Sequence, residues 1–243
     1  MRKLIIAILV LLLPTVGFAS GGHEELDKAA IDLTDQASLQ RGAKYFVNYC
    51  MGCHSLKHMR YSRMAEDLGI DDKSLRDNLL FGNAQPTSMM TNSMRPADGE
   101  TWFGTAVPDL TLVTRWRSPD WVYTYLRSFY ADPARPYGVN NLIFPLVGMP
   151  HVLGDLQGLQ EPVMETHGEG HEATVTGVVL TQPGSLTPEE YDNMVRDITA
   201  FLTYAGEPIK LERRRLGVYV LLFLGLFFIV AYALKKEYWK DIH

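Results

Sequence analysis

The sequence predicts a mainly α, exported domain with long loops and a small β-hairpin, held to a membrane by one C-terminal transmembrane helix. Three observations predict this. A short apolar segment begins the chain, a longer uncharged one lies near its end, and the apolar residues between them recur mostly at helical spacing. The 243 residues leave enough chain between the two apolar segments for one sizeable core.

The start of the chain has the three parts of a secretory signal peptide. A basic start is followed by an apolar run over residues 4–13 and a small-x-small cleavage site at residues 17–19. The run is shorter than the roughly twenty apolar residues of a spanning helix, and Pro14 interrupts it. We expect residues 1–19 to direct export, which would place residues 20–212 in the periplasm.

Residues 216–234 form a second apolar segment of nineteen residues without a charge. At 1.5 Å per residue such a helix is about 28 Å long, which matches the hydrocarbon core of a bilayer. Aromatic side chains mark its edges, as is typical of membrane interfaces, at Tyr219, Tyr232, Tyr238 and Trp239. Basic residues flank both ends, so the exported start decides the orientation. We expect a single-pass protein of the inner (cytoplasmic) membrane whose tail, residues 235–243, lies in the cytoplasm.

The charge balance narrows the possible partners of the exported body. The formal net charge is −5, and basic residues gather beside the two apolar segments, so the exported body is more acidic than the whole chain. This argues against nucleic acid as a partner and favours a basic one. The lipid bilayer is the other partner that the composition indicates.

Apolar residues at helical spacing predict the helices of the exported body. The first is expected over residues 38–50, where the small Gly42 and Ala43 would let another helix approach closely. Further helices are expected at residues 55–69 and 118–130.

The second half of the body combines loops, a hairpin and the clearest helix. Residues 187–204 begin with TPEE, which supplies a cap, a proline in the first helical position and a glutamate in the third. Weak alternation over residues 159–182 predicts a small β-hairpin. Residues 82–108 and 131–154 have no period and predict long loops, which are unusual in a domain unless they enclose something.

The only two cysteines of the chain, Cys50 and Cys53, stand in the sequence CMGCH, with His54 directly after them. In an oxidising compartment an unclaimed Cys-x-x-Cys pair would become a disulfide. The spacing is that of c-type haem attachment, because two sulfurs on one helical turn reach two vinyl groups while the imidazole points at the iron. A thioredoxin-like pair would need a βαβ context, and zinc would need four ligands, with only His58 near. We therefore predict one covalently bound haem c.

A sixth iron ligand is expected if the haem transfers electrons, because an open position favours oxygen chemistry. Met149, in the sequence GMP of the second loop, is a candidate, since glycine allows close approach and proline stiffens the strap. The alternatives are Met89, Met90, Met94, His58, His151 and, with poorer reach, Met64. A thioether would raise the reduction potential, whereas a second histidine would lower it.

Two other groups of polar residues have alternative interpretations. Arg115 and Arg117 could pair with the haem propionates, or either could be an exposed surface charge. A histidine and glutamate cluster could bind a metal, but glycines within it argue against a helix and favour a solvated loop tip. Its members are His167, His171, Glu165, Glu169 and Glu172.

Five segments appear in the order RGAKYFVNYCMGCHSLKHMRYSR, VPDLTLVTRWR, FPLVGMPHVL, DITAFLTYAGEP and RRRLGVYVLL. Together they resemble the cytochrome c1 family, the haem subunits of the cytochrome bc1 complex (ubiquinol:cytochrome c oxidoreductase). The resemblance covers most of the chain and implies a class I cytochrome c-like haem domain with long loop insertions. It implies haem attachment through Cys50 and Cys53, axial ligands His54 and Met149, and a haem pocket that includes Arg117, Pro108 and Phe144. The family often has two prolines where this chain has Val107-Pro108.

The resemblance also implies a function. The chain would be an electron carrier that receives electrons from the Rieske iron–sulfur subunit and passes them to cytochrome c, anchored beside the cytochrome b subunit. No substrate bond would be made or broken in this subunit. Two alternatives stay open: a free-standing membrane-anchored c-type cytochrome, and a haem sensor or enzyme with an open sixth position.

Overall fold

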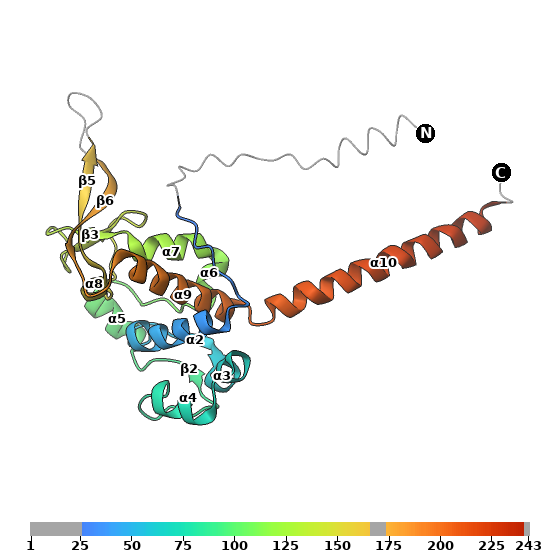
Figure 1. Cartoon of the computed structure of the whole chain (residues 1–243), viewed down its shortest axis with the longest axis horizontal. Helices are drawn as coiled ribbons and strands as arrows, with labels where there is room; N and C mark the ends of the chain where they lie inside the picture. Colours follow the sequence, from blue (N-terminus) through green and yellow to red (C-terminus); the bar gives the residue numbers. More distant parts are fainter. Residues whose placement is uncertain (1–25, 166–173, 241–243) are drawn as a thin grey trace.

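The computed structural model describes residues 26–165 and 174–240. Figure 1 shows a helical body from which a long helix, α10 (Lys210–Tyr238), projects alone, while a β-hairpin stands out elsewhere. The mainly α fold class with small strands and one C-terminal apolar helix is confirmed. The expected signal peptide lies outside the described residues.

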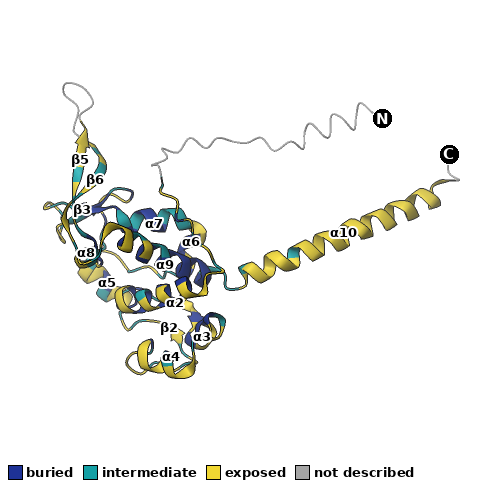
Figure 2. Ribbon diagram, viewed as in Figure 1, coloured by how far each residue is buried: buried dark blue, intermediate teal, exposed yellow. Residues whose placement is uncertain are grey.

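Two helices distant in sequence form the centre of the body. Helix α2 (Gln36–Tyr45) packs against α9 (Pro188–Gly206), which is buried on most of its surface (Figure 2). Their close approach depends on Gly42, because a Cβ added there would lie 2.1 Å from the carbonyl oxygen of Asp197. The expectation that a small residue here admits a neighbouring helix is confirmed.

The predicted start of α9 is confirmed in detail. The Thr187 side chain accepts a hydrogen bond from the Glu190 amide at 3.3 Å, and the Glu190 carboxylate accepts one from the Thr187 amide at 2.9 Å. This reciprocal capping box satisfies amides that have no partner inside the helix. Helix α7 (Pro119–Arg127) also begins as predicted, with the Ser118 hydroxyl accepting from the Trp121 amide at 3.1 Å.

The prediction of a helix over residues 55–69 is confirmed only for its second half. Strand β1 (Leu56–Arg60) occupies the first part, and helix α3 (Tyr61–Leu68) begins after it. The difference has a tertiary cause, since β1 pairs with β2 (Met89–Met90), a segment about thirty residues away that helical spacing cannot reveal. Gly69 ends α3 in a left-handed conformation, with φ of 63°.

The two long loops contain more structure than expected. Within the first lie β2 and helix α5 (Pro96–Phe103), which has a proline in its first turn and ends at Gly104 in a left-handed conformation. The second contains β4 (Val139–Asn141), which pairs with β3 (Phe129–Ala131). Three short helices complete the body, namely α4 (Asp72–Asn78), α6 (Val113–Trp116) and α8 (Gly154–Gln157).

The predicted hairpin is present as β5 (Gly158–Glu165) and β6 (Thr174–Pro183). The strands are antiparallel, with Gly158 opposite Pro183 and Glu165 opposite Thr174. The histidines of the possible metal cluster, His167 and His171, lie outside the described residues together with Glu169 and Glu172.

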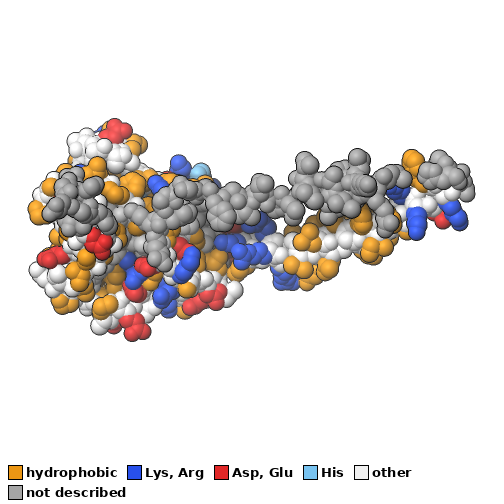
Figure 3. All heavy atoms as spheres, turned by 90° about the horizontal axis from the view of Figure 1, so that it is seen from above, with side chains coloured by type: hydrophobic (Ala, Val, Ile, Leu, Met, Phe, Trp, Pro, Cys, Tyr) orange, Lys and Arg blue, Asp and Glu red, His pale blue; other side chains and the backbone are white. Residues whose placement is uncertain are grey.

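Helix α10 has a long apolar middle and no buried residue. It is the one helix in the described part of the chain that is long and apolar enough to cross a membrane. Lys and Arg side chains gather at both of its ends, with apolar side chains between them (Figure 3). The helix extends beyond the apolar residues 216–234 on both sides, so the flanking basic residues 213–215 are helical too.

Candidate functional site

The CMGCH turn grows directly out of helix α2. A π-helix, η1 (Phe46–Cys50), continues α2, and the Cys53 and His54 amides then donate to the Cys50 carbonyl at 3.1 and 2.8 Å. Single π-turns inside helices are frequent at functional sites. Phe46 anchors the turn to the core, where its ring lies 5.7 Å from the ring of Phe201 on α9.

Both thiols on this turn are free, and they are protected from ionisation. Burial raises the pKa of the Cys50 thiol to about 12 and also raises the pKa of Cys53, which is half-buried. Reactive redox cysteines have lowered pKa values, because the thiolate is the nucleophile. The environment therefore argues against a thioredoxin-like pair and leaves two sulfurs side by side on one turn.

The structure fixes which nitrogen of His54 is available to a ligand. Its Nδ1 lies 2.8 Å from the carbonyl oxygen of Pro108, and a carbonyl can only accept, so Nδ1 carries the proton. Burial lowers the pKa of His54, which favours the neutral ring. Among the described residues nothing hydrogen-bonds to Nε2. An oriented neutral imidazole with one free nitrogen is the usual arrangement of a metal-ligating histidine.

The zinc interpretation of this turn gains no support. His58, the nearest additional ligand in the sequence, is exposed on β1. No group of three or more metal-ligating side chains occurs in residues 26–165 and 174–240.

Residues 144–150, which we call the Met149 strap, are irregular and are held by side chains from elsewhere. The Arg135 guanidinium donates to the carbonyl oxygens of Leu146 and Val147 at 2.8 and 3.1 Å. The Leu146 amide donates to the Asn140 side chain at 2.9 Å. Leu146 itself has a φ of 60°, a conformation that non-glycine residues rarely adopt.

Gly148 allows a close approach between two stretches of backbone. A Cβ at this position would lie 2.9 Å from the carbonyl oxygen of Phe103, at the end of α5. The glycine therefore lets the Met149 strap contact the backbone of the first long loop. The two long loops predicted from the sequence, residues 82–108 and 131–154, therefore contact each other beside Met149.

An aromatic cluster, defined as Trp121, Tyr125 and Phe144 with Arg117, lies next to the strap. The Trp121 and Tyr125 rings stack at 4.9 Å, and Phe144 meets each of them edge-on at 6.2 and 6.3 Å. The Arg117 guanidinium lies 4.8 Å from the Trp121 ring and 5.8 Å from the Phe144 ring. Two residues predicted separately for the haem pocket, Arg117 and Phe144, are therefore neighbours.

Met149 joins this cluster through a hydrogen bond. The Tyr125 hydroxyl donates to the Met149 sulfur at 3.5 Å. The sulfur is thereby linked to the same rings that surround Phe144 and Arg117.

Arg115 and Arg117 have different surroundings. The Arg115 guanidinium pairs with the Glu207 carboxylate at 3.2 Å, and Glu207 also pairs with Arg213 of α10 at 2.6 Å. Arg117 lies against rings and has no carboxylate partner among the described residues. The two arginines therefore differ, since Arg115 is engaged with a carboxylate and Arg117 with aromatic rings.

The alternative sixth ligands have surroundings that differ from those of Met149. Met64 and Met90 are fully buried in the hydrophobic core. His151 stacks on Phe129 with centroids 4.7 Å apart, and its Nε2 is buried without a hydrogen-bond partner among the described groups. Three candidates remain: Met89 and Met94 belong to the first long loop, with Met89 exposed and Met94 half-buried, and His58 is exposed on β1.

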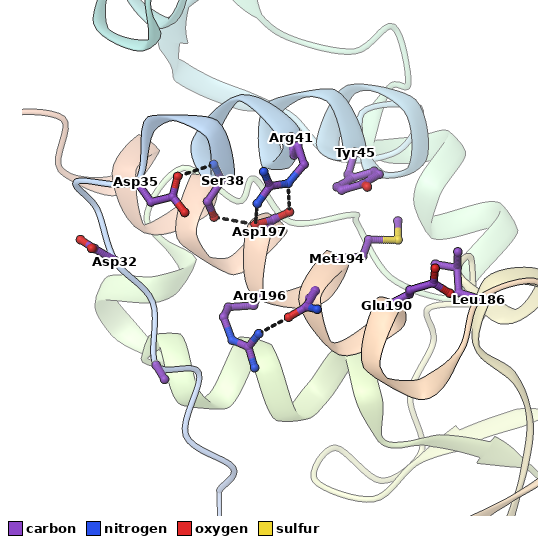
Figure 4. A pocket seen from close by; sticks show the side chains of 12 residues that line it. Asp32, Asp35, Ser38, Arg41, Tyr45, Leu186, Glu190, Met194, Arg196 and Asp197 are labelled. Carbon is purple, nitrogen blue, oxygen red and sulfur yellow. Dashed lines mark hydrogen bonds and ion pairs between the residues drawn. The ribbon is translucent and has the colours of Figure 1, made fainter.

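A separate groove of about 620 Å³ lies between α2 and α9, and none of the predicted haem residues lines it. Figure 4 shows Ser38 and Arg41 of α2 pointing at Asp197 of α9. The Arg41 guanidinium pairs with this buried carboxylate at 2.6 and 3.0 Å, and the Ser38 hydroxyl donates to it at 2.5 Å. These bonds fix the contact between the two helices on which the CMGCH turn stands.

The described residues fit a covalently attached haem. They supply two free thiols on one turn, an imidazole with one free nitrogen, a thioether, and a cation over apolar rings. The sequence reasoning missed Trp121, Tyr125 and Arg135. The spacing of WVYTY placed the first two on one helix face, whereas nothing in the sequence marked Arg135.

Comparison with known proteins agrees with this chemistry. The model of the Cytochrome C1 family matches residues 27–242. A cytochrome c1 of Allochromatium vinosum is 68% identical over the whole of both chains, and a cytochrome c1 of Saccharomyces cerevisiae is 26% identical over 86% of this chain and 68% of its own length. A Nitrosomonas europaea protein named ammonia monooxygenase gamma subunit is 47% identical over 96% of each chain. The chain therefore belongs to the cytochrome c1 family, the membrane-anchored electron-transfer subunits of the cytochrome bc1 complex, which carry one covalently bound haem c.

Proposed function

We propose that this chain carries electrons from the Rieske iron–sulfur subunit to cytochrome c. The observation that carries the proposal is the CMGCH turn, where two free thiols precede an imidazole whose Nδ1 is committed to the Pro108 carbonyl at 2.8 Å. When bound, haem c supplies a one-electron couple. Cys50 and Cys53 would hold it through thioether bonds, and His54 would offer Nε2 to the iron.

In this proposal Met149 would supply the other ligand to the iron. Three features support it over the other methionines: it stands on an irregular strap, its sulfur is held by the Tyr125 hydroxyl, and it adjoins the aromatic cluster. A thioether ligand suits a carrier that works at high potential, because soft sulfur favours the ferrous ion.

Arg117, Phe144 and Pro108 complete the pocket. Arg117 is free to form bidentate hydrogen bonds with a propionate, and Phe144 supplies apolar surface beside it. Pro108 acts through its carbonyl, which holds the His54 ring in one tautomer and orientation.

The proposed topology places the haem domain, residues 20–212, in the periplasm. Residues 1–19 direct its export, residues 216–234 of α10 span the inner membrane beside the cytochrome b subunit, and residues 235–243 lie in the cytoplasm. The acidic balance of the exported body would attract a basic cytochrome c by long-range steering, an effect that weakens with salt.

Optical spectroscopy of the purified oxidised complex tests the ligand set. We expect a weak long-wavelength sulfur-to-iron band that disappears in Met149→Leu and persists in the matched control Met89→Leu. Ready binding of carbon monoxide by the reduced wild-type protein would contradict the proposal, because it would indicate an open sixth position and favour a sensor or enzyme.

Co-purification tests the partners. We expect the chain, extracted in mild detergent, to remain with a quinol-oxidising b-type cytochrome and an iron–sulfur protein. A chain that purifies alone with its haem would instead be a free-standing anchored cytochrome. Dilution into high salt should slow electron transfer to a basic cytochrome c if electrostatic steering operates.

A further inference from the structure

Tyr125 is the residue whose hydroxyl reaches the Met149 sulfur. We infer that this hydrogen bond positions the thioether and raises the reduction potential of the haem, which makes Tyr125 a positioning residue for electron transfer. The inference rests on the proposed function, since it takes Met149 as an axial ligand.

The contact has the chemistry of a hydrogen bond. The Tyr125 oxygen lies 3.5 Å from the Met149 sulfur, within the range for a sulfur acceptor. A thioether has lone pairs but no hydrogen to donate, so the phenol must be the donor. A tyrosine phenol keeps its proton at physiological pH.

The Tyr125 ring cannot turn away from the strap without losing several contacts. It stacks on Trp121 at 4.9 Å and meets Phe129 edge-on at 5.1 Å and Phe144 at 6.3 Å. Each such aromatic pair contributes roughly 0.5–1.5 kcal/mol beyond the area it buries. The hydroxyl is therefore held in place before any ligand bond forms.

Helix α7, which carries the ring, is itself tied down. Its Asp120 carboxylate accepts from the Ala29 amide at 3.0 Å and from the Lys28 ammonium at 2.8 Å. The Met149 strap, in contrast, has no regular structure of its own. Tyr125 thus connects the irregular strap to a rigid element.

The hydrogen bond has a predictable electronic effect. It occupies one sulfur lone pair and leaves another for the iron, and it withdraws electron density from the sulfur. Because the ferric ion depends more on electron donation than the ferrous ion, weaker donation favours the ferrous state. Hydrogen bonds to the ligands of a metal tune its potential in this way.

The chain offers a matched control on the same helix. Tyr123 lies two residues before Tyr125 and is buried, but its hydroxyl is 3.5 Å from the Arg196 guanidinium of α9, away from the strap. Tyr123→Phe therefore makes the same chemical change, the loss of one buried hydroxyl, without touching Met149.

Redox titration of the purified complex, followed at the haem absorption bands, tests the inference. In Tyr125→Phe we expect covalent haem to be retained, the sulfur-to-iron band to shift, and the preference for the ferrous state to fall about threefold. At 59 mV per tenfold change in a one-electron couple, this is a potential about 30 mV lower. Tyr123→Phe should match the wild type in both measurements.

The outcomes separate this inference from the proposed function. A wild-type potential in Tyr125→Phe, or an equal fall in Tyr123→Phe, would overturn the role of Tyr125. If Met149→Leu keeps the sulfur-to-iron band, the ligand assignment itself is wrong. The titration reports the potential of the haem-loaded molecules alone. A variant that folds or loads haem poorly therefore gives a weaker signal, but not a lower potential.

Discussion

The two sides of the candidate haem site are built in different ways. The proximal turn, residues 50–54, continues helix α2 and is closed by amide hydrogen bonds within five residues. The Met149 strap has no regular structure, and Arg135, Asn140 and Tyr125 hold it from distant parts of the chain. We therefore expect attachment through the two cysteines to depend on local structure, although Pro108, 54 positions away, holds the His54 ring. The ligand proposed on the strap, Met149, should depend on tertiary packing throughout.

The two sides also differ in burial. Cys50 and His54 are 8% and 9% exposed, while Leu146 at the turn of the strap is 70% exposed. Segments with few buried contacts open locally at low free energy. Changes on the proximal side should abolish haem attachment or folding, and changes on the strap should adjust the ligand bond.

Removing both thiols should have the largest effect and tests the local side directly. In the double variant Cys50→Ala/Cys53→Ala we expect no covalently bound haem, because no thioether bond can form. Haem staining after denaturing electrophoresis measures this, and Met149→Leu should keep its stain. Haem that stays on the double variant through acid acetone extraction would refute local attachment.

The CMGCH turn and the Met149 strap also differ in how far the sequence alone could predict them. CMGCH was interpretable because its chemistry lies in five adjacent residues. Met149 could not be separated from its alternatives by spacing, and only the resemblance to a family selected it. The contact that distinguishes it, from the hydroxyl of Tyr125, joins residues 24 positions apart in the chain.

Secondary structure shows the same limit. The start of helix α9 was predicted correctly, because four adjacent residues, 187–190, carry the whole capping signal. Strand β1 was predicted as helix, because its partner β2 lies far along the chain. Helix α5 was missed, although Pro96 in its first turn and Gly104 at its end are recognisable signals.

Gly42→Ala should have the next largest effect, because it disturbs the core behind the proximal turn. The new Cβ would lie 2.1 Å from the Asp197 carbonyl oxygen, which forces α2 and α9 apart. Overpacking costs about 3 kcal/mol, and the better helix propensity of alanine returns about 1 kcal/mol. We expect a net loss of about 2 kcal/mol in the free energy of unfolding.

Thermal unfolding of the detergent-solubilised protein measures this loss. Gly52→Ala is the matched control, because a Cβ at Gly52 would meet nothing within 4 Å even though it stands between the two cysteines. If both variants melted at the same temperature, the α2–α9 contact would not support the proximal turn.

Arg135→Ala should have a smaller effect, confined to the strap. It removes the two hydrogen bonds to the Leu146 and Val147 carbonyls, which contribute about 1 kcal/mol after allowance for solvent. We expect the sulfur-to-iron band to be lost at lower urea concentration than in the wild type, while global unfolding is almost unchanged. Arg95→Ala, which removes an exposed pair with Asp98, should change neither transition.

The smallest expected effect is that of Arg117, which belongs to the aromatic cluster next to the strap. Arg117→Gln removes a positive charge near the haem, and the ferric state, which carries one more positive charge, then becomes more favourable. The reduction potential should fall, with a change in the free energy of reduction on the order of 0.5 kcal/mol, since an exposed charge is screened. Redox titration at low and high salt measures the fall, which should shrink as salt increases.

Arg117→Lys keeps the charge but cannot stack on Trp121 and Phe144 as a planar group. If Lys and Gln lower the potential equally, the planar contact with the aromatic cluster matters more than the charge, and Arg117 belongs with the strap rather than with the propionates.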